Sequence, residues 1–158
     1  MKLKDWLGKW HMDSLKINAK FLELELKFEE SDRKAAWELY IELITRTTTQ
    51  RLTKEHGNEL AAIDSVYQIF PLTRQIIKEN GRNCIEFTKI AIVVLNQVIR
   101  PFTTKWHKLS LESALQDKKM CKEFRKELAE LQDVLRKYTQ MLSEMAGVED
   151  LTDLLVLN

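Results

Sequence analysis

Residues 15–28 have the sequence LKINAKFLELELKF, and this stretch decides how the rest of the chain is interpreted. Apolar and polar residues alternate along it, with a one-residue shift of phase at Phe21 and Leu22. Alternation is typical of a half-buried β-strand, and such a shift is what a β-bulge produces. A helix is the alternative interpretation, because Leu22 and Leu26 also belong to a stripe with helical spacing. We predict an extended strand over about 14–28.

No other part of the chain is typical of a strand, so the predicted strand lacks a partner within its own chain. A lone strand leaves backbone N–H and C=O groups without hydrogen bonds, and a second copy or another protein would supply them. We therefore expect this segment to serve assembly rather than chemistry, with aromatic residues as anchors of the contact. The predicted interface consists of Trp6, Trp10, Leu15, Ile17, Phe21, Leu24, Leu26 and Phe28.

The remainder of the chain has the composition of a helical protein. Only 4 glycines and 2 prolines occur among its 158 residues, which leaves few positions for the turns of a sandwich or barrel. The predicted fold class is all-α: a bundle of four to five helices with one N-terminal extended strand that pairs between chains. We divide the chain into an N-terminal arm (1–30), a helical bundle (31–147) and an acidic, then apolar, C-terminal tail (148–158).

Helix boundaries follow from capping residues, glycines and prolines. A long helix is predicted from Ser31 to near Gly57. The last helix is predicted to start between Ser110 and Asp117 and to stop at Gly147. That last helix carries apolar residues at two heptad positions with a wider stripe on one side, which is typical of a bundle helix with several neighbours. Pro71 is predicted to break or kink its helix after Phe70.

The most apolar helix is predicted over 84–99 and should be the central element of the bundle. We predict that Pro101, following Arg100, ends this helix. The residues from Phe102 to Leu109 would then form a connector to the last helix.

Charge and cysteine content exclude several classes of protein. The chain has 25 basic and 24 acidic residues, a net charge of +1, whereas a dedicated duplex-DNA binder usually has a strong basic excess. Cys84 and Cys121 lie within helical patterns and suit a reduced compartment. The first residues lack the apolar core of a secretory signal, and the longest apolar run, Ile90 to Leu95, is too short to cross a bilayer. We expect a cytoplasmic protein that binds no membrane.

One octapeptide, RPFTTKWH, carries a pattern that suggests chemistry; it begins at Arg100 and ends at His107. In a helical chain it resembles the signature of HEPN ribonucleases, a family whose helical bundles dimerise so that two Arg/His pairs face each other across the interface. The resemblance implies His107 as acid or base and Arg100 as a phosphate clamp. The alternative is an interhelical connector, in which Pro101 sets the turn while Phe102 and Trp106 fill the end of the bundle.

Metal and cofactor sites are not expected. His11, His56 and His107 are far apart in sequence, and none has a second ligand at metal-site spacing. A glycine-rich phosphate loop and a serine nucleophile elbow are also missing from the sequence.

We expect a non-catalytic helical-bundle assembly protein that binds itself, a larger protein partner, or both. It would be an oligomeric component or small subunit of a prokaryotic multi-protein system, of the defence or toxin–antitoxin type. That setting rests on the general character of the chain rather than on any one residue. The alternative function is a metal-independent, HEPN-like ribonuclease that uses Arg100 and His107, and only this alternative implies a nucleic-acid partner.

Overall fold

The computed structural model describes residues 1–46 and 58–155. This part of the chain contains helices and no β-strand, so the all-α prediction is confirmed. The elements are α1 (Leu3–Lys9), α2 (Ala19–Leu22), α3 (Glu30–Ile44), α4 (Glu59–Tyr67), α5 (Ile69–Asn80), α6 (Ile85–Val94), the π-helix η1 (Leu95–Ile99), α7 (Arg100–Leu111), the 3₁₀ turn η2 (Ala114–Gln116), α8 (Lys118–Ala146) and the 3₁₀ turn η3 (Thr152–Leu155).

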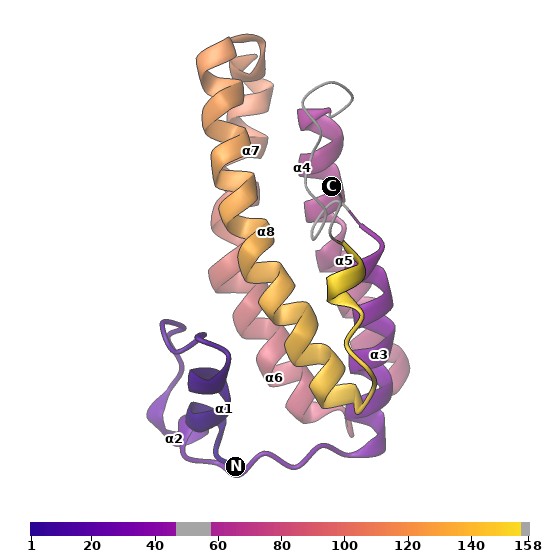
Figure 1. The fold of residues 1–158 in the computed structure, drawn as a ribbon. Coiled ribbons are helices and arrows are strands. Elements are labelled where there is room, and N and C mark those ends of the chain that lie inside the picture. Colours follow the sequence, from indigo (N-terminus) through magenta and orange to yellow (C-terminus); the bar gives the residue numbers. More distant parts are fainter. Residues whose placement is uncertain (47–57, 156–158) are drawn as a thin grey trace.

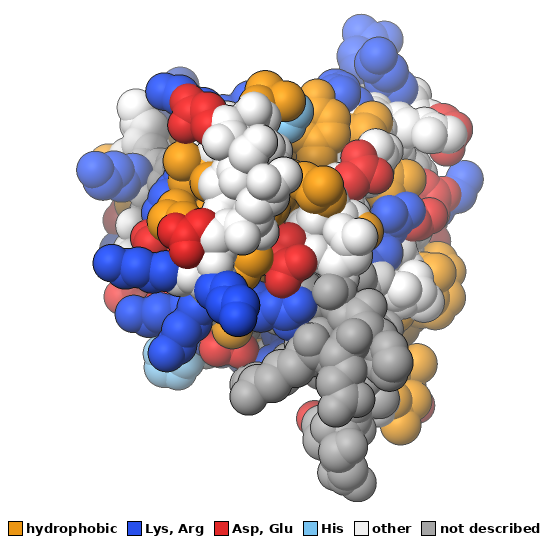
Figure 2. Space-filling view, turned by 90° about the horizontal axis from the view of Figure 1, so that it is seen from above, with side chains coloured by type: hydrophobic (Ala, Val, Ile, Leu, Met, Phe, Trp, Pro, Cys, Tyr) orange, Lys and Arg blue, Asp and Glu red, His pale blue; other side chains and the backbone are white. Residues whose placement is uncertain are grey.

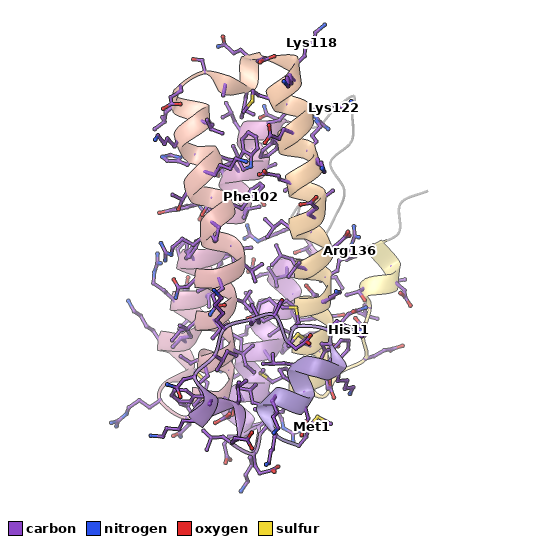
Figure 3. The ribbon with its side chains drawn as sticks, turned by 90° about the vertical axis from the view of Figure 1, so that its left-hand side faces the viewer. Met1, His11, Phe102, Lys118, Lys122 and Arg136 are labelled. Carbon is purple, nitrogen blue, oxygen red and sulfur yellow. The ribbon has the colours of Figure 1, made fainter. Side chains whose placement is uncertain are left out.

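The long helices lie side by side and alternate in direction (Figure 1). α3 rises, α4 and α5 descend, α6, η1 and α7 rise again, and α8 descends beside them. Phe102 of α7 points between α7 and α8 (Figure 3), where its ring centroid lies 5.7 Å from that of Phe124. Among the described residues, no helix combines the length and the apolar character needed to span a membrane.

α8 matches its prediction closely. It starts after Asp117, whose side chain accepts a hydrogen bond from the N–H of Lys119, and ends before Gly147, which has a φ of 71°. Glycine adopts this left-handed conformation without the steric cost that a Cβ brings. The buried heptad residues are Phe124, Leu128, Leu131, Leu135, Tyr138, Leu142 and Met145.

Pro71 interrupts its helix, but the break lies at Gln68 rather than after Phe70. A proline ring clashes with the carbonyl group four residues earlier in an α-helix, which here belongs to Tyr67. Because α4 ends at Tyr67 and α5 starts at Ile69, the turn between them avoids this clash and leaves Pro71 in the first turn of α5.

The predicted helix end at Pro101 is wrong, and the predicted connector from Phe102 to Leu109 is helical. α6 continues through the π-helix η1 into α7, which begins at Arg100. In η1 the N–H of Arg100 donates to the carbonyl oxygen of Leu95, five residues earlier. This wider turn accommodates a proline ring that would strain a regular α-turn. The predicted count of four to five helices is therefore not confirmed, because the breaks between helices lie at residues other than those predicted.

α3 begins close to its predicted start but ends at Ile44. The hydroxyl of Thr45 donates to the carbonyl oxygen of Ile41 at 2.8 Å, a return hydrogen bond that threonines make in helices. The predicted continuation to near Gly57 falls on residues 47–57, which lie outside the described residues, as do residues 156–158 of the predicted tail.

The extended strand predicted over about 14–28 is wrong, because no strand forms among these residues. Ala19–Leu22 forms the short helix α2, so the shift of phase at Phe21 lies in a helical turn and not in a bulge. The extended part that follows pairs with the start of the same chain. The N–H of Leu3 donates to Leu24 at 3.1 Å and the N–H of Leu26 donates to Met1 at 2.9 Å.

A side chain supplies further partners for this segment's backbone. The Gln97 Oε1 accepts the N–H of Lys16 at 2.8 Å, and the Gln97 Nε2 donates to the Lys16 carbonyl at 2.6 Å. One glutamine amide thus makes the two hydrogen bonds that a neighbouring strand would make. The alternation arises because one side of an irregular, extended segment packs on the bundle. The side chains packed there include Leu15, Ile17, Leu22, Leu26 and Phe28.

Candidate functional site

A groove of about 810 Å³ lies between α4–α5 and α7. Its α7 wall runs from Arg100 to Leu111 and its other wall runs from Leu60 to Arg74. The lining residues on each wall recur mostly every three or four positions, which places them on one face of each helix. The packing of α4 against α7 therefore brings together residues that are far apart in sequence.

Arg100 is held in a fixed position at one end of the groove. Its guanidinium carbon lies 4.8 Å from the centroid of the Phe70 ring, and its Nε donates to the Oδ1 of Asn96 at 3.0 Å. In the described part of the chain no other group hydrogen bonds to this guanidinium. A stacked and oriented arginine fork suits a carboxylate or a phosphate.

His107 lines the same groove and its side chain is exposed. It lies seven residues after Arg100 on α7, so about 10 Å separates the two along the helix axis. Arg100 leans toward Asn96, one turn further from His107. The two side chains that the HEPN resemblance assigns to one site therefore share a groove but face different stretches of it in this conformation.

The groove is more basic than the chain as a whole. Arg74, Arg100 and Lys108 line it together with a single acidic residue, Asp64. Arg74 and Lys108 are exposed, and among the described residues neither forms an ion pair. Because the net charge of the chain is only +1, this local excess indicates a preference for an acidic ligand.

Apolar side chains are exposed along the groove. Leu60 and Tyr67 on one wall are more than half exposed, and Leu111 on the other wall is 75% exposed. Figure 2, a view of the upper end of the bundle, shows hydrophobic side chains interspersed with basic and acidic ones. Neighbouring exposed apolar residues of this kind are typical of a binding surface.

Two copies of the tripeptide Lys-Trp-His dock on glutamates of α8, and sequence reasoning missed both contacts. The first begins at Lys9, and the Lys9 Nζ donates to Glu144 at 2.7 Å. Trp6 and Trp10 donate to the same carboxylate at 3.0 and 2.8 Å. Figure 3 shows the segment from Met1 to His11 lying against the lower part of α8.

The second copy begins at Lys105. Lys105 and Trp106 donate to the two oxygens of Glu127 at 2.5 and 2.6 Å. The hydrogen bond that Lys105 donates to Glu127 raises the pKa of Lys105. The repeated tripeptide is the signal in the sequence that points to these contacts. Lys105 and Trp106 contact Glu127 of α8. The candidates for function in the octapeptide are therefore its groove-lining residues.

The residues predicted to form an interface between chains divide into three groups: buried, exposed and partly buried. Trp6 is 2% exposed and packs within its own chain, where its ring centroid lies 5.6 Å from that of Phe28. Phe21 and Leu24 remain exposed on the surface. The partly buried members that pack against the core of their own chain are Trp10, Leu15, Ile17, Leu26 and Phe28.

The part of the chain that the structure describes contains no group of three or more histidine, cysteine, aspartate or glutamate residues arranged to hold a metal ion. Cys84 and Cys121 are free thiols there, and burial raises the pKa of the Cys121 thiol. Comparison with protein-family models, with curated proteins and with solved structures finds no match for this chain. The groove between α4–α5 and α7 is therefore the best-supported candidate site.

Proposed function

We propose that this protein is a non-catalytic helical assembly protein that binds a second copy of itself through the groove between α4–α5 and α7. The observation that carries the proposal is the exposure of Leu60, Tyr67 and Leu111 along one groove. Burying such side chains against a partner is the main favourable term in association. Most of the interface predicted from sequence packs within its own chain, which makes this groove the better candidate for contact between chains.

Sedimentation velocity over a range of protein concentrations tests this proposal. We expect a reversible dimer whose association Leu111→Asp weakens by at least about tenfold, since a charge would enter an apolar contact. Ile92→Asp is the matched control, because Ile92 is 50% exposed on α6 and does not line the groove. A wild-type protein that stays monomeric up to about 1 mM, where association is too weak to matter, would overturn the proposal.

A HEPN-like ribonuclease is the second candidate function. The specific observation in its favour is that Arg100 and His107 both line the groove and are both exposed. If two copies associate through this groove, each copy's arginine and histidine would lie close to the interface, as the resemblance implies for that family.

Cleavage of a labelled single-stranded RNA in buffer with a metal chelator tests this candidate. His107→Ala should reduce the cleavage rate by at least about 100-fold, because a positioned acid or base contributes a factor of that size. Lys105→Ala is a suitable control on the same helix, since Lys105 contacts Glu127 and does not line the groove. Cleavage that persists in His107→Ala, or no cleavage by the wild type, excludes this function.

A further inference from the structure

Residues 148–155 of the C-terminal tail form a fixed acidic projection on the side of the bundle. The N–H of Leu151 donates to the Tyr40 hydroxyl at 2.6 Å, and Gln140 donates to the hydroxyl of Thr152 at 3.2 Å. Thr152 also donates to both carboxylate oxygens of Asp150, through its N–H and its hydroxyl. These bonds hold η3 against α3 and α8, so little conformational entropy remains to be lost when the tail binds a partner.

The tail and the groove each expose a large apolar side chain. Among the exposed large hydrophobic residues of the described chain, Leu154 (77%) and Leu111 (75%) have the largest exposed fractions. Leu154 lies in the tail and Leu111 at one end of the groove. The hydrogen bonds of the tail are made with α3 and α8, so its own groove is not where it docks.

The two surfaces also carry opposite charges. The tail has exposed Glu149 and Asp153 beside its exposed leucine. The groove has Lys108 one turn from Leu111, with Arg74 and Arg100 toward the opposite end. Opposite charges around an apolar contact steer association and fix its orientation.

We infer that the tail of one copy docks in the groove of a second copy, with Leu154 beside Leu111 and the tail carboxylates facing the basic residues of the groove. The inference rests on the proposed self-association and names the segment that fills the groove. Each copy has one tail and one groove, so two reciprocal contacts close a twofold dimer. Because the contact pairs exposed charges, dimerisation should weaken as the salt concentration rises.

Charge reversal tests the inference in the full-length protein, with dimer dissociation measured by analytical ultracentrifugation. Reversing the tail (Glu149→Lys with Asp153→Lys) or the groove (Arg74→Glu with Lys108→Glu) should each raise the dissociation constant by at least about tenfold. Combining both reversals should restore dimerisation to near the wild-type value. The groove residues chosen form no ion pair among the described residues, so their reversal breaks no ion pair there.

Leu154→Asp supplies an independent test beside the control Ile92→Asp, and far-UV circular dichroism verifies that each variant is folded. Dimerisation that Leu111→Asp weakens and that the tail variants leave unchanged would overturn the tail contact while the groove remains the interface. Failure of the double reversal to restore dimerisation would also overturn it. A wild-type protein that remains monomeric would instead overturn the proposed self-association, and the tail contact with it.

Discussion

Replacing Asp32 by alanine should be one of the most destabilising single substitutions in this chain. Asp32 is fully buried near the start of α3. Its Oδ2 accepts the N–H of Glu29 at 2.8 Å, and its Oδ1 accepts the N–H of Phe87 at 3.0 Å. One carboxylate therefore caps α3 and also joins it to the first turn of α6, 55 residues later.

The magnitude follows from the two hydrogen bonds. A hydrogen bond to a charged group contributes roughly 1.5–3 kcal/mol, and Asp32→Ala leaves both N–H groups without their acceptor, so we expect a loss of about 3–6 kcal/mol. Asp32→Asn keeps one acceptor oxygen and should lose about half as much. Since a domain of this size is stable by roughly 5–15 kcal/mol, the alanine variant should lose a large share of its free energy of unfolding.

Urea unfolding followed by circular dichroism measures this loss. Asp133→Ala is the control, because Asp133 is exposed and contacts Arg136 three residues along the same helix, and such a pair contributes less than about 1 kcal/mol. An Asp32→Ala variant that is no less stable than Asp133→Ala, at equal m-value, would refute the reasoning. It would mean that water or a local shift replaces the carboxylate at both N–H groups.

Three further predictions concern stability. Burial opposes ionisation of Glu144, but hydrogen bonds from Lys9, Trp10 and Trp6 prevail and lower its pKa. Its stabilising effect should therefore be complete above about pH 4.5 and fade as the pH falls through the lowered pKa, and urea midpoints of Glu144→Gln should vary less with pH than those of the wild type. Gly147→Ala should lower the free energy of unfolding by about 1–2 kcal/mol, because Gly147 has a φ of 71°. Gly8→Ala should raise it by up to about 1 kcal/mol, because nothing lies within 4 Å of the added Cβ in α1. Changes of the same sign for the two variants in urea unfolding would contradict this prediction. Tyr138→Phe should leave stability unchanged or raise it by about 1 kcal/mol in thermal unfolding, because no described group hydrogen bonds to the buried hydroxyl. A clear loss of stability would contradict this and would reveal a hydrogen-bond partner for the hydroxyl.

The helical class and the course of α8 were predictable because they depend on local patterns. A heptad stripe, an aspartate cap and a terminal glycine act within a few residues of one another, and α8 follows them from Lys118 to Ala146. The same local rules failed at Pro101, because a proline ends an α-helix but is accommodated by a π-turn. Nothing in the residues near Pro101 distinguishes these two outcomes.

The groove was predictable only in part. Arg100 and His107 were paired through the resemblance to the HEPN signature, and both line the groove. Arg74, Lys108 and Leu60 were not associated with them, because α4, α5 and α7 are separated by tens of residues and only their packing forms the groove. Helical spacing shows which residues share one face of a helix, but it does not show which other helix lies opposite that face.

The sequence by itself determined that this is a helical protein with a long heptad helix and few turns. The tertiary structure decided what residues 15–28 do, because alternation records only that one side of an extended segment is buried. Hydrogen bonds with Met1, Leu3 and Gln97 give several backbone groups of that segment partners within its own chain. The tertiary structure also placed the exposed leucines and the opposite charges on the groove and the tail. Contacts between residues far apart in the chain depend on how whole helices pack, and no local pattern specifies that packing.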